Sequence, residues 1–167
     1  MINLYRILDS HEIQYERHDH PPVYTVEQAD RLVPPVPAVK TKNLFLRDQK
    51  GKRHFLVCLE AARQVNLKKL AGTLGVKRIS FGSAARLQKY LGVAPGAVSV
   101  FGLINDTAGK VELVFDSRLW ENHAFQFHPL VNTSTLCVSR KDIEKFVALT
   151  GHRIRVLDLP GKEQARF

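Results

Sequence analysis

The chain has 167 residues, of which 44% are hydrophobic and 25% are charged. This length suits one domain with a core of its own, which we expect to span residues 1–167, and the composition is globular rather than disordered. No run approaches the ~18 apolar residues of a membrane span. Arg6, Asp9 and Glu12 interrupt the first apolar residues, so we expect no signal peptide and a cytoplasmic protein.

The charge balance is strongly basic, because 25 Lys and Arg stand against 16 Asp and Glu, for a formal net charge of +9. Such a surplus attracts polyanions and speeds their capture. The basic residues are spread along the chain, which favours a broad face against a phosphate backbone over a flexible basic tail. The alternative is that the charge serves only solubility.

Two cysteines, Cys58 and Cys137, both lie in alternating apolar segments. The pattern is typical of buried thiols in a reducing cytosol, against the alternatives of a disulfide or a catalytic role.

The first half of the chain predicts helices around a β-hairpin. A short helix begins near Leu4, an extended piece follows, and prolines leave room for only a short helix between residues 22 and 34. Two apolar segments flank a polar turn and predict the hairpin. Two amphipathic helices follow, each ending at a glycine. The hairpin strands and the two helices are expected at 40–48, 52–60, 66–75 and 83–92.

The second half has more strand character. Residues 97–104 and 110–116 predict a second hairpin, and 119–132 predict a loop rich in His, Asn and aromatic residues. The short strand 135–139 leads to a helix capped by Ser139. A final strand stops at Pro160. Because strands and helices do not alternate regularly, we expect an α+β fold with a mixed, mostly antiparallel sheet curled toward a barrel and flanked by helices.

Familiar catalytic signatures are absent from the sequence: it has no nucleophile elbow, no phosphate-binding loop and no zinc-ligand spacing. We therefore expect no metal and no cofactor, and any hydrolysis would use positioned water and fixed dipoles. Three segments are nevertheless candidates for a functional site, and each also has a purely structural explanation. Lys42 and Asn43 enter a strand and could bind a phosphate or ribose oxygen, or lie on a solvated rim.

The other two segments are loops. Gly92 and Gly96 surround a proline, so their N–H groups could form an oxyanion hole, or the segment could simply connect a helix to a strand. His128 is held between an aromatic residue and a proline, which suits an orienting hydrogen bond, although a lone histidine is often structural.

Together and in this order, the segments DHPPVYTVEQ, KTKNLFLRD, LGVAPGAVSVFGLIND and FHPLVNTSTLCVS resemble the YbaK/ProX superfamily of prolyl-tRNA editing domains. The similarity covers nearly the whole chain. It is greatest to the free-standing ProXp-ala (PrdX-like) branch of alanyl-tRNA(Pro) deacylases, and Asn43 favours that branch over the one that acts on Cys-tRNA(Pro).

The resemblance implies an enzyme that hydrolyses the aminoacyl ester without a protein nucleophile. It makes Lys42 the functional lysine, with His128 and the glycine loop as its catalytic companions. Pro95 stands three residues after Gly92 rather than the family's four, so the resemblance does not choose between the two glycines. The remaining substrate-binding candidates are Tyr24, Val26, Asn43, Gly102 and Asn105.

The implied partners are the acceptor stem of tRNA(Pro) and prolyl-tRNA synthetase. Two alternatives stay open. The same chemistry could act on another mischarged tRNA, such as Ser- or Cys-tRNA, or the chain could be a non-catalytic module that binds tRNA or another nucleic acid.

Overall fold

A computed structural model describes residues 2–22, 24, 25, 27, 28, 31 and 37–162. Val26 and parts of the helix expected between the prolines lie outside these residues. The elements are, in chain order, α1 (Leu4–Ser10), β1 (Glu16–Asp19), β2 (Val39–Asp48), β3 (His54–Glu60), α3 (Leu67–Leu74), β4 (Ile79–Phe81), α4 (Ala84–Leu91), the 3-10 helix η1 (Val100–Asn105), β5 (Val111–Asp116), α5 (Ser117–Trp120), β6 (Ala124–Phe127), β7 (Ser134–Ser139), α6 (Arg140–Thr150) and β8 (Ile154–Leu157).

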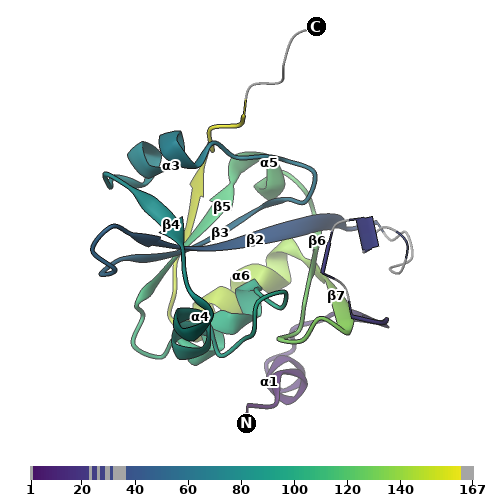
Figure 1. Ribbon diagram of the computed structural model, residues 1–167. Helices are drawn as coiled ribbons and strands as arrows, with labels where there is room; N and C mark the ends of the chain where they lie inside the picture. The colour runs from purple at the N-terminus through teal and green to yellow at the C-terminus, as the bar shows by residue number, and fades with distance from the viewer. Residues whose placement is uncertain (1, 23, 26, 29–30, 32–36, 163–167) are drawn as a thin grey trace, which may run out of the picture.

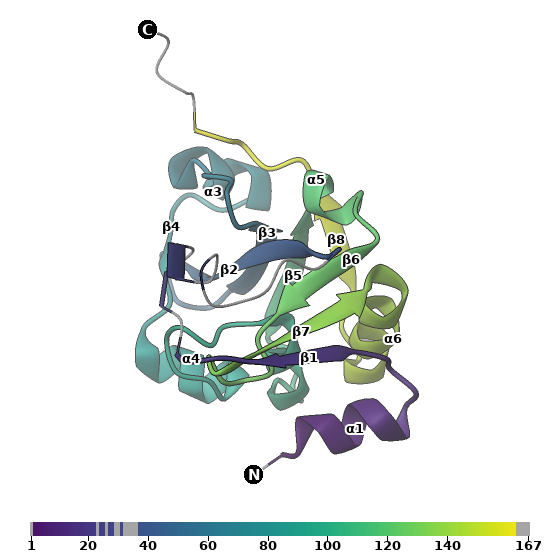
Figure 2. The same ribbon diagram turned by 90° about the vertical axis from the view of Figure 1, so that its right-hand side faces the viewer.

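The described strands form one mixed sheet in the order β1-β7-β6-β2-β3-β5-β8, with β4 also paired to β2 (Figures 1 and 2). Four pairings are antiparallel, whereas β2–β6, β3–β5 and β5–β8 are parallel. The sheet is open, because its end strands β1 and β8 do not pair with each other. The expected α+β class with a mixed sheet and flanking helices is confirmed.

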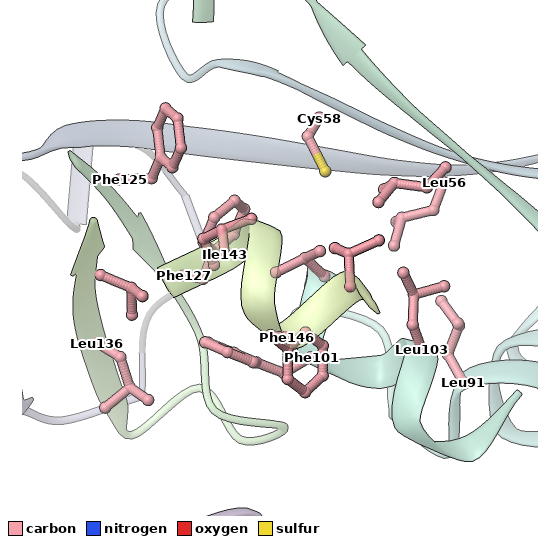
Figure 3. Packing of buried hydrophobic residues seen from close by; sticks show 14 of the residues in the cluster. Leu56, Cys58, Leu91, Phe101, Leu103, Phe125, Phe127, Leu136, Ile143 and Phe146 are labelled. Carbon is pink, nitrogen blue, oxygen red and sulfur yellow. The ribbon is translucent and has the colours of Figure 1, made fainter. Parts of the chain in front are cut away.

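Helices cover both faces of this sheet. Helix α3 lies on one face, and α4 and α6 lie on the other, as Figures 1 and 2 show from two directions. The larger core lies on the α4/α6 side, where Phe101 packs edge-on against Phe146 with ring centroids 5.0 Å apart (Figure 3). A smaller core, which includes Leu46 and Leu70, lies beneath α3.

The capped helices form where the sequence predicts them. Asn66, Ser83 and Ser139 each accept a hydrogen bond from a backbone N–H of the first turn, and left-handed glycines end all three helices. The hairpin of β2 and β3 is likewise confirmed, with Lys42 opposite Leu59.

Two expectations for the second half were wrong. Residues 97–104 are not a strand, since η1 occupies 100–105, and Ser99 begins it by accepting a hydrogen bond from the Phe101 N–H. A continuous buried apolar run has no periodicity that separates a strand from a helix. Strand β5 consequently has no hairpin partner there and pairs in parallel with β3 and β8. The expected loop 119–132 also contains a strand, β6.

Candidate functional site

A pocket of about 300 Å³ opens where the edge of β2 is left without a neighbour. On the edge away from β3, β2 pairs with β6 only through Val39 and Lys40, and with β4 only from Leu46 onward. The residues between these pairings are free to face a hollow. The pocket is lined by Tyr24, Thr25, Lys40, Thr41, Lys42, Asn43, Ala61, Gly96, Val98, Gln126, Phe127, His128 and Thr135.

At the pocket, side chain to backbone hydrogen bonds join β2 to β6. The Thr41 hydroxyl donates to the Gln126 carbonyl oxygen at 2.6 Å, and the Gln126 amide donates to the Ala38 carbonyl oxygen at 2.9 Å. These bonds continue the contact between the strands past the last backbone pair, so the point at which the strands separate is fixed.

Lys42 borders the pocket but extends toward the α3 face of the sheet. Alternation along β2 places it on the same face as Leu44, whose side chain packs on the smaller core. Its ammonium donates to the carbonyl oxygen of Arg63. Burial lowers the pKa of Lys42, and the nearby charge of Lys162 lowers it further.

The acceptor for Lys42 is itself fixed by a buried ion pair. The Arg63 guanidinium donates to the carboxylate of Asp116, which is fully buried, and to the Leu159 carbonyl oxygen. A buried pair that satisfies its donors in this way keeps one geometry. The loop after β3 therefore presents a fixed oxygen to the lysine.

Asn43 faces the opposite side of β2, toward the interior of the pocket. Its amide nitrogen lies 3.4 Å from the Thr41 hydroxyl. Its amide oxygen is covered and has no hydrogen-bond partner among the described residues. A covered acceptor without a donor costs about 1–3 kcal/mol, so this amide oxygen destabilises the wall of the pocket.

His128 directly follows β6 and has its tautomer set by the backbone. Its Nδ1 lies 2.9 Å from the Ser134 carbonyl oxygen, which can only accept, so Nδ1 carries the proton. Burial lowers the pKa of His128, and His20 nearby lowers it as well, against the opposing effect of the Ser134 carbonyl. The ring is therefore neutral at pH 7, with a lone pair on Nε2.

A second histidine, His20, lies next to His128. The His20 and His128 ring centroids are 6.2 Å apart. The His20 Nδ1 lies 2.8 Å from the Pro21 carbonyl oxygen, and its Nε2 lies 2.8 Å from the Thr135 hydroxyl. His20 thereby fixes the start of β7, whose Ser134 carbonyl orients His128.

Gly96 brings the glycine loop to the pocket. The Ala97 N–H donates to the Ala94 carbonyl oxygen at 3.1 Å, which closes a turn with Pro95 and Gly96 at its centre. The φ angle of Gly96 is 92°, a value that favours glycine. A Cβ there would lie 3.5 Å from the ring of Tyr24, which also lines the pocket and is 70% exposed.

Three other predicted site residues lie outside the pocket lining. Gly92 ends α4 with a φ of 65°, and the Asn105 amide donates to the Leu91 carbonyl oxygen at 2.9 Å. Gly102 is buried, and a Cβ on it would lie 3.0 Å from the Leu91 Cβ. Gly92, Gly102 and Asn105 meet at the end of α4, where they join that helix to η1.

Several lining residues were missed by the sequence analysis, namely Thr41, Gln126, Thr135, Ala61 and Val98. Gln126 had a usable signal, because Phe-Gln-Phe at 125–127 alternates as a strand does. Thr135 had no such signal in the sequence, since its role depends on a contact with His20, 115 positions away.

Cysteine chemistry does not contribute to this pocket. Cys58 is fully buried and Cys137 is half-buried, and neither lines the pocket. Burial raises the pKa of both thiols, that of Cys137 to about 11. Within the described ranges, no cluster of three His, Cys, Asp or Glu could hold a metal ion, and no helix is long and apolar enough to cross a membrane.

Comparison with known proteins identifies the family. The sequence model of the aminoacyl-tRNA editing domain matches residues 20–146, which carry every side chain that lines the pocket. The chain belongs to the aminoacyl-tRNA editing domain family. Among similar proteins, the prolyl-tRNA editing protein ProX of Acetoanaerobium sticklandii is 40% identical over 91% of this chain and 93% of its own length.

Animal relatives of this editing domain are also similar over most of their length. The prolyl-tRNA synthetase associated domain-containing protein 1 of Bos taurus is 36% identical over 84% of each chain. A crystal structure described as a candidate trans-editing enzyme for prolyl tRNA synthetase superposes with a TM-score of 0.69. It covers 96% of this chain and 99% of that one at 18% identity, and this likeness shows the shared fold.

Proposed function

We propose that the protein is a trans-acting deacylase that removes alanine wrongly attached to tRNA(Pro). The observation that carries the proposal is the meeting of Lys42, Asn43, Gly96 and a neutral His128 around one small pocket. Family membership and the name of the ProX relative support the reaction class. The acceptor stem of tRNA(Pro) is the proposed partner, and prolyl-tRNA synthetase is the enzyme whose errors would be corrected.

Water is the nucleophile in this proposal. Its oxygen attacks the ester carbonyl carbon, and its proton passes to the lone pair on the His128 Nε2. The Gly96 N–H, which has no acceptor among the described residues, stabilises the developing oxyanion. The tetrahedral intermediate then expels the 3′-oxygen of the terminal adenosine, which takes the proton back from His128.

The remaining residues position the substrate. Lys42 holds the terminal nucleotide by its ribose oxygens or phosphate, and Asn43 lines the pocket that receives the aminoacyl group. Three threonine hydroxyls line the pocket, and each is already hydrogen-bonded: Thr41 to the Gln126 carbonyl oxygen, Thr135 to His20, and Thr25 to the Gln28 N–H. An aminoacyl ester is reactive enough for positioning and oxyanion stabilisation to suffice.

The size of the pocket supports selection of alanine. Its walls include Tyr24, Ala61 and Val98, and about 300 Å³ is the lower end of the range for ligand sites. A proline ring forced against such walls costs ~1–3 kcal/mol, which corresponds to tenfold or better protection of Pro-tRNA(Pro). Serine should be cleaved more slowly than alanine, because its hydroxyl would be buried without a free partner.

The test is a deacylation panel of Ala-, Ser-, Cys- and Pro-tRNA(Pro) with catalytic amounts of protein. We expect Ala-tRNA(Pro) to be cleaved fastest. Lys42→Ala should lower that rate at least about tenfold, ~1.4 kcal/mol of transition-state stabilisation. Lys141→Ala, an exposed lysine on α6, is the matched control.

Three outcomes would count against the proposal. Equal cleavage of Pro- and Ala-tRNA(Pro) would show that the pocket does not select the amino acid by size. Faster cleavage of Ser- or Cys-tRNA(Pro) would assign another specificity to the same site. Stoichiometric protection of the ester, in place of turnover, would make the protein a tRNA-binding module.

A further inference from the structure

A second hollow, of about 980 Å³, lies on the α3 face of β2, and Lys42 lines both it and the catalytic pocket. We call this hollow the α3 groove. It follows the same unpaired edge of β2, from Lys42 past Leu44 to Phe81 at the end of β4. The proposed site for the ester and the α3 groove are therefore joined at one lysine.

The α3 groove is basic. Lys42, Lys69 and Lys162 line it, and no acidic side chain is present among the described residues of its lining. Burial lowers the pKa of Lys42 most, and the charge of Lys162 lowers it further, so the two ammonium groups lie close enough to repel each other. An anion bound between two such lysines would relieve that repulsion.

The far end of the α3 groove carries an exposed aromatic ring. Phe81 is 58% exposed, although it pairs with Leu46 in the sheet. Four positions of β2 separate Lys42 from Leu46, a span of about 13 Å at 3.3 Å per residue. A solvated aromatic ring beside a basic track is the arrangement on which single-stranded nucleic acids stack.

We propose that the α3 groove binds the unpaired 3′ end of tRNA. A base stacks on Phe81, the backbone phosphates lie along Lys69 and Lys162, and the terminal nucleotide passes Lys42 into the catalytic pocket. At about 3.4 Å per stacked nucleotide, the 13 Å span accommodates about four nucleotides. The assignment of the last nucleotide rests on the proposed deacylase function.

A binding experiment tests this groove without requiring hydrolysis. The probe is a fluorescently labelled tetranucleotide RNA ending in CCA, titrated with the full chain and followed by anisotropy. Phe81→Ala should weaken binding about tenfold, the usual effect of losing one base stack, and Phe81→Trp should restore it. Leu149→Ala is the matched control, because Leu149 is an exposed apolar residue on α6.

The lysines are tested through the salt dependence of the same binding. Lys162→Ala should reduce the slope of log Kd against log salt concentration by about 0.7, the value for one phosphate contact to a single strand. Lys141→Ala should leave the slope unchanged.

Equal affinities for the wild type, Phe81→Ala and Lys162→Ala would overturn the proposal, and the groove would then suit a protein segment instead. Binding that depends on Phe81, in a protein that leaves every mischarged tRNA intact, would support the groove and contradict the deacylase function.

Discussion

A single backbone carbonyl decides what His128 can do. The Ser134 oxygen fixes the proton on Nδ1, and burial lowers the pKa of the ring, so Nε2 accepts a proton at neutral pH. The same ring on an open surface would titrate near pH 6.5 and choose its tautomer freely. The local structure thus converts an ordinary residue type into a candidate base.

The activity of the enzyme should therefore fall in acid. In the proposed mechanism His128 acts when neutral, and its pKa is lowered from the usual 6.5, so kcat/KM should be level at pH 7 and decrease about tenfold per pH unit below the lowered pKa. The measurement is a pH profile of Ala-tRNA(Pro) hydrolysis by the wild type and by His128→Asn. The variant should hydrolyse the ester slowly, and its residual kcat/KM should not fall in acid.

The free energy of unfolding should change with pH in the same direction as the activity. Because the folded state holds the His128 proton less tightly than the unfolded chain, its contribution is complete above about pH 6.5 and is lost as the pH falls. If kcat/KM of His128→Asn still fell in acid as it does in the wild type, the group that titrates would be another residue.

The motifs of the sequence lead to Lys42, Asn43, Gly96 and His128, and the structure brings all four to one pocket. They are recognisable because unusual residue types stand at strand ends and turns. Gly92 belongs to the same motif but ends α4 and does not line the pocket, since a left-handed glycine can either cap a helix or line a site. Sequence spacing does not separate these two uses.

At the scale of elements, the unpaired stretch of β2 creates the site. Strand β2 changes neighbours from β6 to β4 along one edge, and hollows open on both faces of the sheet between the two pairings. The hydrophobic pattern predicts β2 and β3 well. It cannot predict β6 as the parallel neighbour, since that contact joins segments more than 80 residues apart.

The glycines at 92 and 96 offer a matched test of this arrangement. Both have positive φ angles, so replacement by alanine should cost each about 1–2 kcal/mol of unfolding free energy. Gly92→Ala also drives a Cβ to within 2.6 Å of the Asn105 amide. Only Gly96→Ala should lower kcat/KM of the folded enzyme, because only Gly96 lines the pocket.

Gly75→Ala supplies the control for strain alone. Gly75 ends α3 with a φ of 78°, and nothing lies within 4 Å of its added Cβ. Denaturant unfolding and kinetics should be measured on the three variants together. A loss of kcat/KM in Gly92→Ala as large as that in Gly96→Ala would return Gly92 to the catalytic machinery.

Across the whole molecule, the net charge of +9 should act on binding rather than on chemistry. If the basic surface holds the tRNA, KM should rise steeply between 50 and 200 mM salt, by roughly tenfold or more, while kcat changes little. Steady-state deacylation at several salt concentrations measures both. A small alanyl ester of adenosine should show almost no salt effect, and a flat KM for tRNA would confine recognition to the aminoacyl end.

The contacts that fix Lys42 come from distant parts of the chain. Its acceptor belongs to Arg63, which is bonded to Asp116 and to the carbonyl of Leu159, and the Asn66 N–H donates to the Pro160 carbonyl oxygen. During synthesis, the hairpin of β2 and β3 leaves the ribosome long before residue 159 does. The hairpin can form early, whereas the lysine reaches its final setting only after residues 159 and 160 have emerged. The position of Lys42 would thus be set at the same stage at which β8 completes the sheet and Leu159 completes the smaller core.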